Sequence, residues 1–165
     1  MSTQLKGSIR LAGVVRESIV DGPGIRFAVF VQGCPHHCPG CHNPQTHDVA
    51  GGYEVDTDCL IAQMQSNPLL DGLTISGGEP FLQPLECAEL ARKAHQIGLN
   101  VWCYTGYTLE ELQCGVNAEA HKRLLEQVDV LVDGEYRQEE RSLELPWRGS
   151  RNQRIIRITD VEVEG

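Results

Sequence analysis

The chain has 165 residues, a length that predicts one domain over residues 1–165 with a hydrophobic core of its own. Its 14 basic and 23 acidic residues give a net charge of −9, which argues against a broad nucleic-acid-binding face and against attraction to anionic lipid. The sequence has no apolar run long enough for a membrane span and no secretory signal at its start, so we expect a cytoplasmic protein.

The predicted elements alternate between strands and helices. The first half predicts, in chain order, an edge strand over residues 8–20, a turn at 21–24, a strand buried on both faces over 25–31, a long loop over 32–53, a helix from Asp56 or Thr57 to about Ser66, and a short strand over 73–76. The second half predicts a helix that opens at Pro84 and ends at Gly98, a strand over 101–104, helices near 108–113 and 117–127, and strands over 128–132 and 155–158.

This alternation predicts an α/β fold with a parallel sheet. Binding groups on such sheets gather at the carboxyl ends of the strands. Two segments of unusual composition lie there, because residues 32–47 follow one predicted strand and residues 77–80 follow the next. The sequence therefore predicts that the functional site lies where these two loops meet.

The first loop is rich in cysteine. Three of the seven cysteines lie in the run Gly33-Cys34-Pro35-His36-His37-Cys38-Pro39-Gly40-Cys41-His42-Asn43. A disulfide framework favours an even and dispersed set, whereas iron–sulfur clusters are held by closely spaced thiolates on a loop. A four-iron cluster has four corners, and Cys34, Cys38 and Cys41 fill three, so one iron should stay open for a ligand that is not protein. The other cysteines stand alone on predicted helices and a strand: Cys59, Cys87, Cys103 and Cys114.

Zinc is the main alternative at this loop, since three cysteines with His36, His37 or His42 would make a tetrahedral set. Structural zinc usually pairs two short knuckles, and this sequence has no second knuckle. A set of buried free cysteines is less favoured still, because three thiols in a Gly/Pro loop make a poor core. We expect His36 and His37 to be solvated loop residues and not ligands.

The spacing of three residues and then two between the cysteines resembles the motif of the radical S-adenosylmethionine superfamily. In that superfamily the methionine part of the cofactor chelates the open iron, and an electron from the cluster cleaves the cofactor to methionine and a 5′-deoxyadenosyl radical, which takes a hydrogen atom from a substrate. Many members carry an aromatic residue before the third cysteine, where this chain has Gly40. The resemblance therefore implies cofactor contacts from the backbone at Gly40, from Cys41 and from the side chain of His42.

The second loop carries Ser76-Gly77-Gly78-Glu79-Pro80. Alone, a Gly-Gly pair is a common strand-ending turn. Beside the cysteine loop it resembles the Gly-Gly-Glu-Pro element of the same superfamily, which holds the methionine amino group. Glycines let backbone approach a ligand closely, and a carboxylate accepts a charge-assisted hydrogen bond from an ammonium. The resemblance thus implies cofactor contacts at Ser76, Gly77, Gly78 and Glu79.

Two groups of activating enzymes share further motifs with the chain. The first half is similar to the pyruvate formate-lyase activating enzyme at Val20 to Arg26, Gln32 to Cys34, Cys41 to Pro44 and Gly51-Gly52. From about residue 10 to 158 the chain resembles the activating proteins of anaerobic ribonucleoside-triphosphate reductase, with matching motifs at Tyr104 to Tyr107, Val130 to Gly134 and Trp147 to Arg154. The last of these is the best discriminator, so we expect a reductase activator, with a lyase activator as the alternative.

This resemblance implies an incomplete βα barrel: a parallel sheet of roughly five strands with the cluster at its carboxyl edge. An open side would admit a polypeptide loop. The implied activity is hydrogen abstraction from a glycine of the reductase, which leaves a glycyl radical, with reduced flavodoxin or a similar protein as electron donor.

A function of another class stays open, because an iron–sulfur electron carrier would also need the cysteine loop. Carriers normally fill all four corners with cysteine, so the missing fourth ligand is the discriminating feature. Arg148, Arg151 and Arg154 form a basic patch in an acidic chain, and it is either ordinary surface or a contact for the partner.

Overall fold

The computed structural model describes residues 7–36, 46–48, 50–141 and 146–158. These residues build one seven-stranded sheet in the order β3-β1-β2-β4-β5-β6-β7. The strands are β1 (Ser8–Ser18), β2 (Arg26–Val31), β3 (Tyr53–Asp56), β4 (Gly72–Gly77), β5 (Asn100–Tyr104), β6 (Val130–Asp133) and β7 (Arg154–Arg157). The helices are α1 (Thr57–Gln65), α2 (Pro84–Gln96), α3 (Leu109–Leu112) and α4 (Ala118–Leu125), with 3₁₀ turns η3 (Pro80–Leu82) and η4 (Gln138–Glu140).

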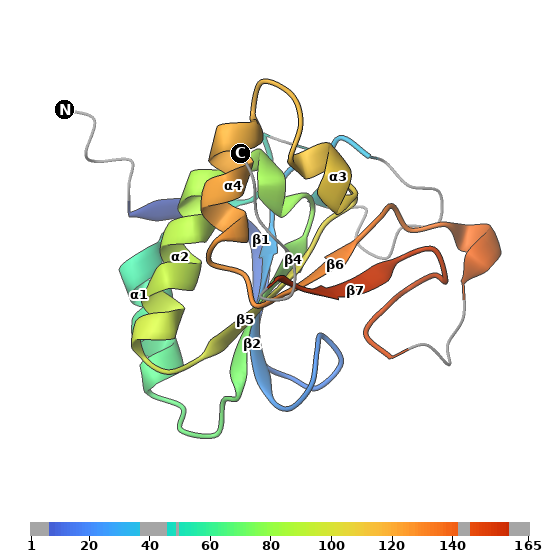
Figure 1. The fold of residues 1–165 in the computed structure, drawn as a ribbon. Coiled ribbons are helices and arrows are strands. Elements are labelled where there is room, and N and C mark those ends of the chain that lie inside the picture. The colour runs from blue at the N-terminus through green and yellow to red at the C-terminus, as the bar shows by residue number, and fades with distance from the viewer. Residues whose placement is uncertain (1–6, 37–45, 49, 142–145, 159–165) are drawn as a thin grey trace.

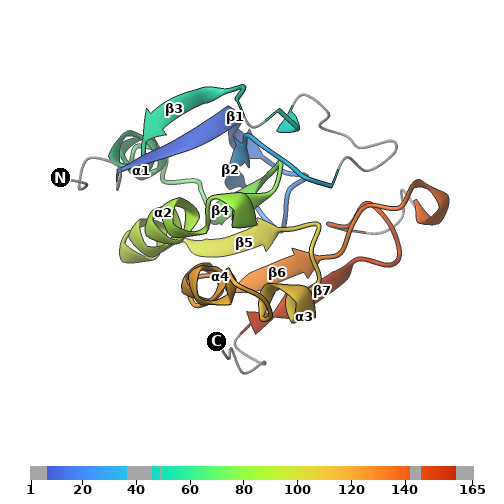
Figure 2. The ribbon, with the colours of Figure 1, turned by 90° about the horizontal axis from the view of Figure 1, so that it is seen from above.

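The centre of the sheet is parallel. Strands β2, β4, β5 and β6 all run in the same direction. Val31 at the end of β2 pairs with Gly77 of β4, and Trp102 of β5 pairs with Val130 of β6. Helices α1, α2 and α4 lie along one face of this sheet (Figures 1 and 2). The carboxyl ends of the four parallel strands therefore meet at one edge, as the alternation of strands and helices predicted.

Two helix starts follow the local sequence signals. Asp56 caps α1 through a side-chain oxygen that accepts from the amide of Asp58, and Pro84 occupies the first turn of α2. Helix α2 ends just before Gly98, whose φ of +89° suits glycine. Both helices were predicted with these boundaries.

The outer strands correct the expected sheet. Strand β1 was expected at the edge, but β3 pairs with it from outside. Strands β1, β3 and β7 are antiparallel to their neighbours, so the sheet is mixed and has two more strands than the roughly five parallel ones expected. Strand β3 was not predicted; it starts at Tyr53, the last residue of the loop expected over residues 32–53.

The two faces of the sheet are unequal. The main core fills the face under the helices, with Phe27, Leu73, Ile75 and Leu131 among its buried members. On the opposite face Trp102, Val130 and Val132 form a smaller cluster, with Tyr104 and Trp147 packed against it.

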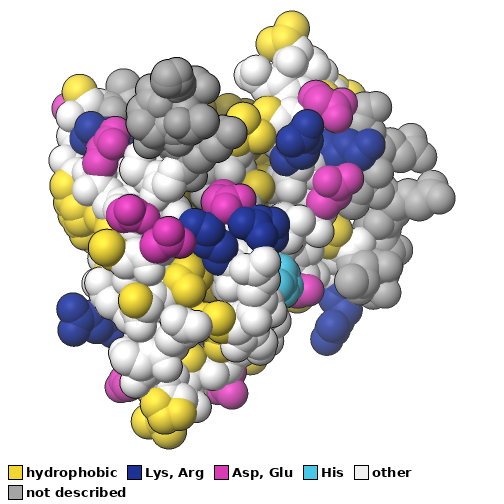
Figure 3. All heavy atoms as spheres, turned by 90° about the vertical axis from the view of Figure 1, so that its left-hand side faces the viewer, with side chains coloured by type: hydrophobic (Ala, Val, Ile, Leu, Met, Phe, Trp, Pro, Cys, Tyr) yellow, Lys and Arg dark blue, Asp and Glu magenta, His cyan; other side chains and the backbone are white. Residues whose placement is uncertain are grey.

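The helical side of the molecule carries both signs of charge. Acidic and basic side chains lie next to one another over the face shown in Figure 3. On helix α2, Glu89 pairs with Arg92, and Lys93 pairs with Asp58 at 2.7 Å. Among the described residues, no helix is long and apolar enough to cross a membrane.

Candidate active site

The cysteine loop and the glycine turn lie on adjacent strands. Val31 at the end of β2 is in register with Gly77 at the end of β4. The amide of Gly78 donates to the carbonyl of Val31 over 2.8 Å, and the amide of Glu79 donates to the carbonyl of Gly33 over 2.7 Å. The two sequence-predicted segments are thus joined by backbone hydrogen bonds at the carboxyl edge of the sheet.

Hydrogen bonds close the cysteine loop at its base. The amide of Gly33 donates to the carbonyl of Thr46 over 2.5 Å, and that of Cys34 donates to the carbonyl of His47 over 3.2 Å. Cys34 is buried, with 9% of its surface exposed. Of the other predicted site residues, Gly40 and His42 lie outside the described part of the chain, as do Cys38 and Cys41.

The Gly-Gly pair is required by the backbone. Gly77 has a φ of +97°, a backbone angle that residues with a side chain rarely adopt. A Cβ on Gly78 would collide with the carbonyl oxygen of Gly33. Ser76, Gly77 and Gly78 are half-buried. The turn therefore offers backbone at close range beside the first cysteine.

Glu79 is fully buried and accepts four hydrogen bonds. One oxygen, Oε1, accepts from Nε2 of His36 at 2.7 Å and from the amide of Gly106 at 2.8 Å. The other, Oε2, accepts from the Thr105 hydroxyl at 2.7 Å and from the amide of Phe81 at 3.1 Å. A carboxylate has about four lone-pair positions, so these protein donors fill it.

His36 lies between two carboxylates. Its Nε2 faces Glu79, and its Nδ1 lies 2.9 Å from Oε2 of Glu135. Both ring nitrogens can donate only when the imidazole is protonated, so a position between two carboxylates favours its charged form. Burial opposes that charge, but the hydrogen bonds and charges of Glu79 and Glu135 outweigh it and raise the pKa of His36 above its ordinary value.

The expectation that His36 is a solvated loop residue is wrong, since only 9% of its side chain is exposed. The structure also argues against His36 as a zinc ligand, because both ring nitrogens are already used in hydrogen bonds to carboxylates. His37 lies outside the described residues.

Comparisons with known proteins bear on the identity of this site. Residues 20–156 match a protein family described as a 4Fe-4S single cluster domain. Anaerobic ribonucleoside-triphosphate reductase-activating protein of Vibrio cholerae is 36% identical over 150 residues, which cover 86% of this chain and 93% of that protein. The chain belongs to this family of activating proteins. The Escherichia coli K12 member is 35% identical over 144 residues (82% of this chain, 90% of that protein), and the phage T4 member is 35% identical over 148 residues (86% and 89%).

The segment from Trp147 to Arg154, which best distinguished this activating-protein family in the sequence, lies beside the site. The side-chain amide of Asn152 donates to the carbonyl of Glu135 over 2.7 Å, and that of Gln153 donates to the carbonyl of Gly134 over 3.0 Å. Arg154 pairs with the buried carboxylate of Asp133. These residues hold the loop after β6, which presents Glu135 to His36.

The remaining cysteines fit the family's single cluster. Cys59 and Cys114 are exposed, and burial raises the pKa of the Cys87 and Cys103 thiols well above the ordinary value. In the described part of the chain, no three His, Cys, Asp or Glu side chains are grouped to hold a metal ion. The cysteines outside the loop therefore offer no second cluster site among these residues.

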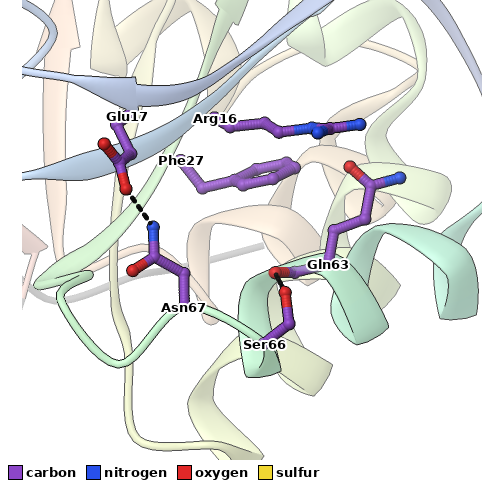
Figure 4. A pocket seen from close by; sticks show the side chains of 6 residues that line it. All are labelled: Arg16, Glu17, Phe27, Gln63, Ser66 and Asn67. Carbon is purple, nitrogen blue, oxygen red and sulfur yellow. Dashed lines mark hydrogen bonds between the residues drawn. The ribbon is translucent and has the colours of Figure 1, made fainter.

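A surface hollow seen in Figure 4 lies elsewhere. Phe27 and Arg16 line it from β2 and β1, Gln63 from α1, and Ser66 and Asn67 from the turn after that helix. Arg16 and Phe27 lie near the end of the sheet opposite Val31 and Gly77. This hollow is therefore separate from the site that the cysteine loop and the glycine turn form at the carboxyl edge of the sheet.

Sequence reasoning missed His36, Thr105, Gly106 and Glu135 as parts of this site. A weak signal existed, because Thr105 and Gly106 follow one predicted strand and Glu135 follows another, as Glu79 does. The carboxyl-end rule for parallel sheets could have placed them together. It could not have shown that a histidine inside the cysteine motif joins them.

Proposed function

We propose that this protein activates an anaerobic ribonucleoside-triphosphate reductase by generating a glycyl radical on it, with a single domain that carries one 4Fe-4S cluster. Cys34, Cys38 and Cys41 would hold the cluster. The observation that carries this proposal is the buried Cys34 on a loop closed at its base, directly beside the glycine turn of the neighbouring strand. Membership of the activating-protein family supports the same partner.

The cofactor is proposed to be S-adenosylmethionine. When bound to the reduced cluster it would supply a one-electron cleavage to methionine and a 5′-deoxyadenosyl radical able to take hydrogen from a glycine Cα. The chain's own part is to bind, orient and shield these groups. We assign the backbone of Gly40 and Cys41 and the side chain of His42 to the adenine end.

The turn over Ser76, Gly77 and Gly78 is assigned to the methionine end. Its glycines leave backbone within reach of a ligand. Glu79 was expected to accept from the methionine amino group, but an ammonium can reach that carboxylate only by displacing one of its four donors. We therefore propose that the amino group lies against the backbone of the turn and that Glu79 fixes the shape of the turn.

The substrate glycine is proposed to enter from the face of the sheet opposite the helices. A sheet curved as an incomplete βα barrel would leave this side open to a polypeptide loop. Glycine suits such a site because its Cα has no side chain to hinder approach. Electrons would come from a reduced flavin protein of the flavodoxin type in the cytoplasm.

One experiment separates this function from its alternatives. The anaerobically reconstituted protein is reduced, mixed with S-adenosylmethionine and either the reductase or pyruvate formate-lyase, and examined by electron paramagnetic resonance. We expect a glycyl doublet with the reductase and none with the lyase. A doublet only with the lyase would contradict the assignment of the partner, and absence of deoxyadenosine in every mixture would favour an electron carrier.

The cluster ligands are tested separately by metal analysis. Reconstitution should load about four irons per chain, as a 4Fe-4S cluster requires. Cys34→Ala, Cys38→Ala and Cys41→Ala should each abolish this loading, whereas Cys59→Ala and Cys87→Ala should not. Tightly bound zinc with no uptake of iron and sulfide would overturn the proposal.

A further inference from the structure

One side chain connects the loops that follow all four parallel strands. His36 lies in the loop after β2 and contacts Glu79 after β4 and Glu135 after β6. Its ring meets the ring of Tyr107, which follows β5, edge to face with the centroids 4.7 Å apart. Because these strands are neighbours in the sheet, His36 spans the whole carboxyl edge on which the proposed site is built.

The ring occupies a slot that fits it closely. Gly106 forms one wall, since a Cβ at that position would lie 2.5 Å from Cδ2 and 2.6 Å from Nε2 of His36. Tyr107 forms another, and the two carboxylates hold the ring nitrogens from opposite sides. A ring that can donate on two sides fits this slot, whereas an aliphatic side chain would remove one of the four donors to Glu79 and the ring's contact with Glu135.

The outer carboxylate is itself supported. Asn152 and Gln153 hold the backbone of Gly134 and Glu135, and the Ser150 hydroxyl accepts from the amide of Arg137 over 3.1 Å. The side chain of Glu135 is 53% exposed, so this end of the contact faces solvent, whereas Glu79 is inaccessible. His36 is therefore held between a fixed buried acceptor and a surface acceptor.

We propose that His36 is a positioning residue that fixes the cysteine loop against the glycine turn and thereby sets the S-adenosylmethionine site. This inference rests on the proposed cluster site at Cys34, Cys38 and Cys41. His36 lies two residues after Cys34, so its contacts hold the described start of the cysteine loop against the two carboxylates. Its bond to Glu79, the residue after the Ser76–Gly78 turn, holds that turn in a fixed position relative to the start of the cysteine loop.

The two sides of the ring can be separated by substitution. His36→Gln keeps a donor near the position of Nε2 and so retains the contact with Glu79. His36→Asn keeps a donor near the position of Nδ1 and so retains the contact with Glu135. His36→Ala removes both. If the bond to Glu79 sets the cofactor site, the glutamine variant should resemble the natural protein more closely than the other two.

The experiment compares these variants after anaerobic reconstitution. Iron and sulfide content should stay at the natural level, because all three cysteines remain. The dissociation constant for S-adenosylmethionine, measured from its effect on the paramagnetic resonance of the reduced cluster, should rise about tenfold or more in His36→Ala and His36→Asn, as the loss of a hydrogen bond to a charged group implies. The rise should be clearly smaller in His36→Gln.

Hydrogen exchange supplies a readout that does not depend on the cofactor. Amides of residues 105–107 and 134–136 should exchange faster in His36→Ala, because their loops lose a shared contact. His95→Ala is the matched control: His95 also faces a carboxylate, that of Asp129 at 3.4 Å, but at the opposite edge of the sheet. It should leave cofactor affinity and exchange at these loops unchanged.

The proposal is overturned if all three His36 variants bind S-adenosylmethionine as the natural protein does, or if they lose iron together. If they fail to fold, Glu135→Ala at the exposed end replaces them. It should speed exchange at residues 34–36 and, because the bond to Glu79 remains, weaken cofactor binding less than tenfold. Unchanged exchange at residues 34–36 would overturn the proposal. Failure of the natural protein to take up iron or respond to S-adenosylmethionine would instead contradict the proposed function.

Discussion

The amide of Glu79 donates a hydrogen bond to the carbonyl of Gly33 over 2.7 Å, so the acid that ends the glycine turn is bonded to the residue before the first cysteine. The side chain of Glu79 then turns back to accept from His36, two residues after Cys34. Backbone and side chain of one residue thus hold the same loop at two points. This double attachment makes Glu79 a structural centre of the site.

Glu79→Ala should lower the free energy of unfolding by about 3–5 kcal/mol, the range for removing one partner of a buried ion pair. The substitution leaves four donors without their acceptor. Urea unfolding of the reconstituted proteins, without cofactor, measures the effect. Glu89→Ala is the control, because its solvent-exposed pair with Arg92 should contribute little to stability. Equal losses in the two variants would show that the buried network is not stabilising.

Gly106→Ala should destabilise the protein by about 1–3 kcal/mol, the usual range for overpacking, because the new methyl group would displace the His36 ring. Gly13→Ala is the control, since a Cβ there meets no atom within 4 Å. In a His36→Gly background the effect of Gly106→Ala should largely disappear, as a double-mutant cycle can measure. An equal loss in both backgrounds would show that the two residues do not contact.

Much of the fold follows from local sequence signals. The run from Ile25 to Val31 predicts a buried strand, and Pro84 and Gly98 mark the ends of a helix. Strand β3 escaped prediction because Tyr53–Asp56 is only four residues long and is held by pairing with β1, some 45 positions away in the sequence. Strand order at the edges depends on such distant pairings, which local patterns do not encode.

The site was predictable in its backbone and not in its side-chain network. Adjacent parallel strands bring the cysteine loop and the glycine turn together, and that placement is confirmed. The contacts of His36 with Glu79 and Glu135 join residues 43 and 99 positions apart. From sequence alone, a charged residue is expected on the solvated surface. The burial of His36 and Glu79 becomes evident only from how the loops pack together.

The cysteines should divide by reactivity toward iodoacetamide. Burial raises the pKa of Cys87 and Cys103 well above the ordinary value, so little reactive thiolate forms at pH about 8. Cys59 and Cys114 are exposed and should be alkylated in the native protein. Mass spectrometry before and after denaturation checks this. Rapid native labelling of Cys87 or Cys103 would contradict the burial on which the prediction depends.

Arg26→Lys should lower the free energy of unfolding by about 1.5–3 kcal/mol, the scale of hydrogen bonds to a charged group. The guanidinium is fully buried, donates to Thr74 and Asn100 at 2.7 Å each, and lies over the ring of Trp102. A lysine ammonium cannot reproduce this planar fork. Arg92→Lys is the exposed control and should change little. A neutral result for Arg26→Lys would mean that the fork is dispensable.

Arg148 and Arg151 should differ in their effects on the reductase, although both belong to the basic patch identified in the sequence. Arg148 donates to the carbonyl of Gln153 over 3.0 Å and is half-buried, whereas the side chain of Arg151 is exposed. A contact with an acidic group of the partner therefore falls to Arg151. Its removal should slow association and reduce the dependence of that rate on salt, because exposed charges act mainly on encounter.

Stopped-flow measurement of association with the proposed reductase, at several salt concentrations, tests this difference. Arg151→Ala should lower the association rate and leave the unfolding free energy nearly unchanged. Arg148→Ala should lower the unfolding free energy, because it frees the carbonyl of Gln153, the residue whose side chain holds Gly134. If Arg151→Ala associates at the natural rate and with the natural salt dependence, the exposed end of the patch is ordinary surface and the partner is recognised elsewhere.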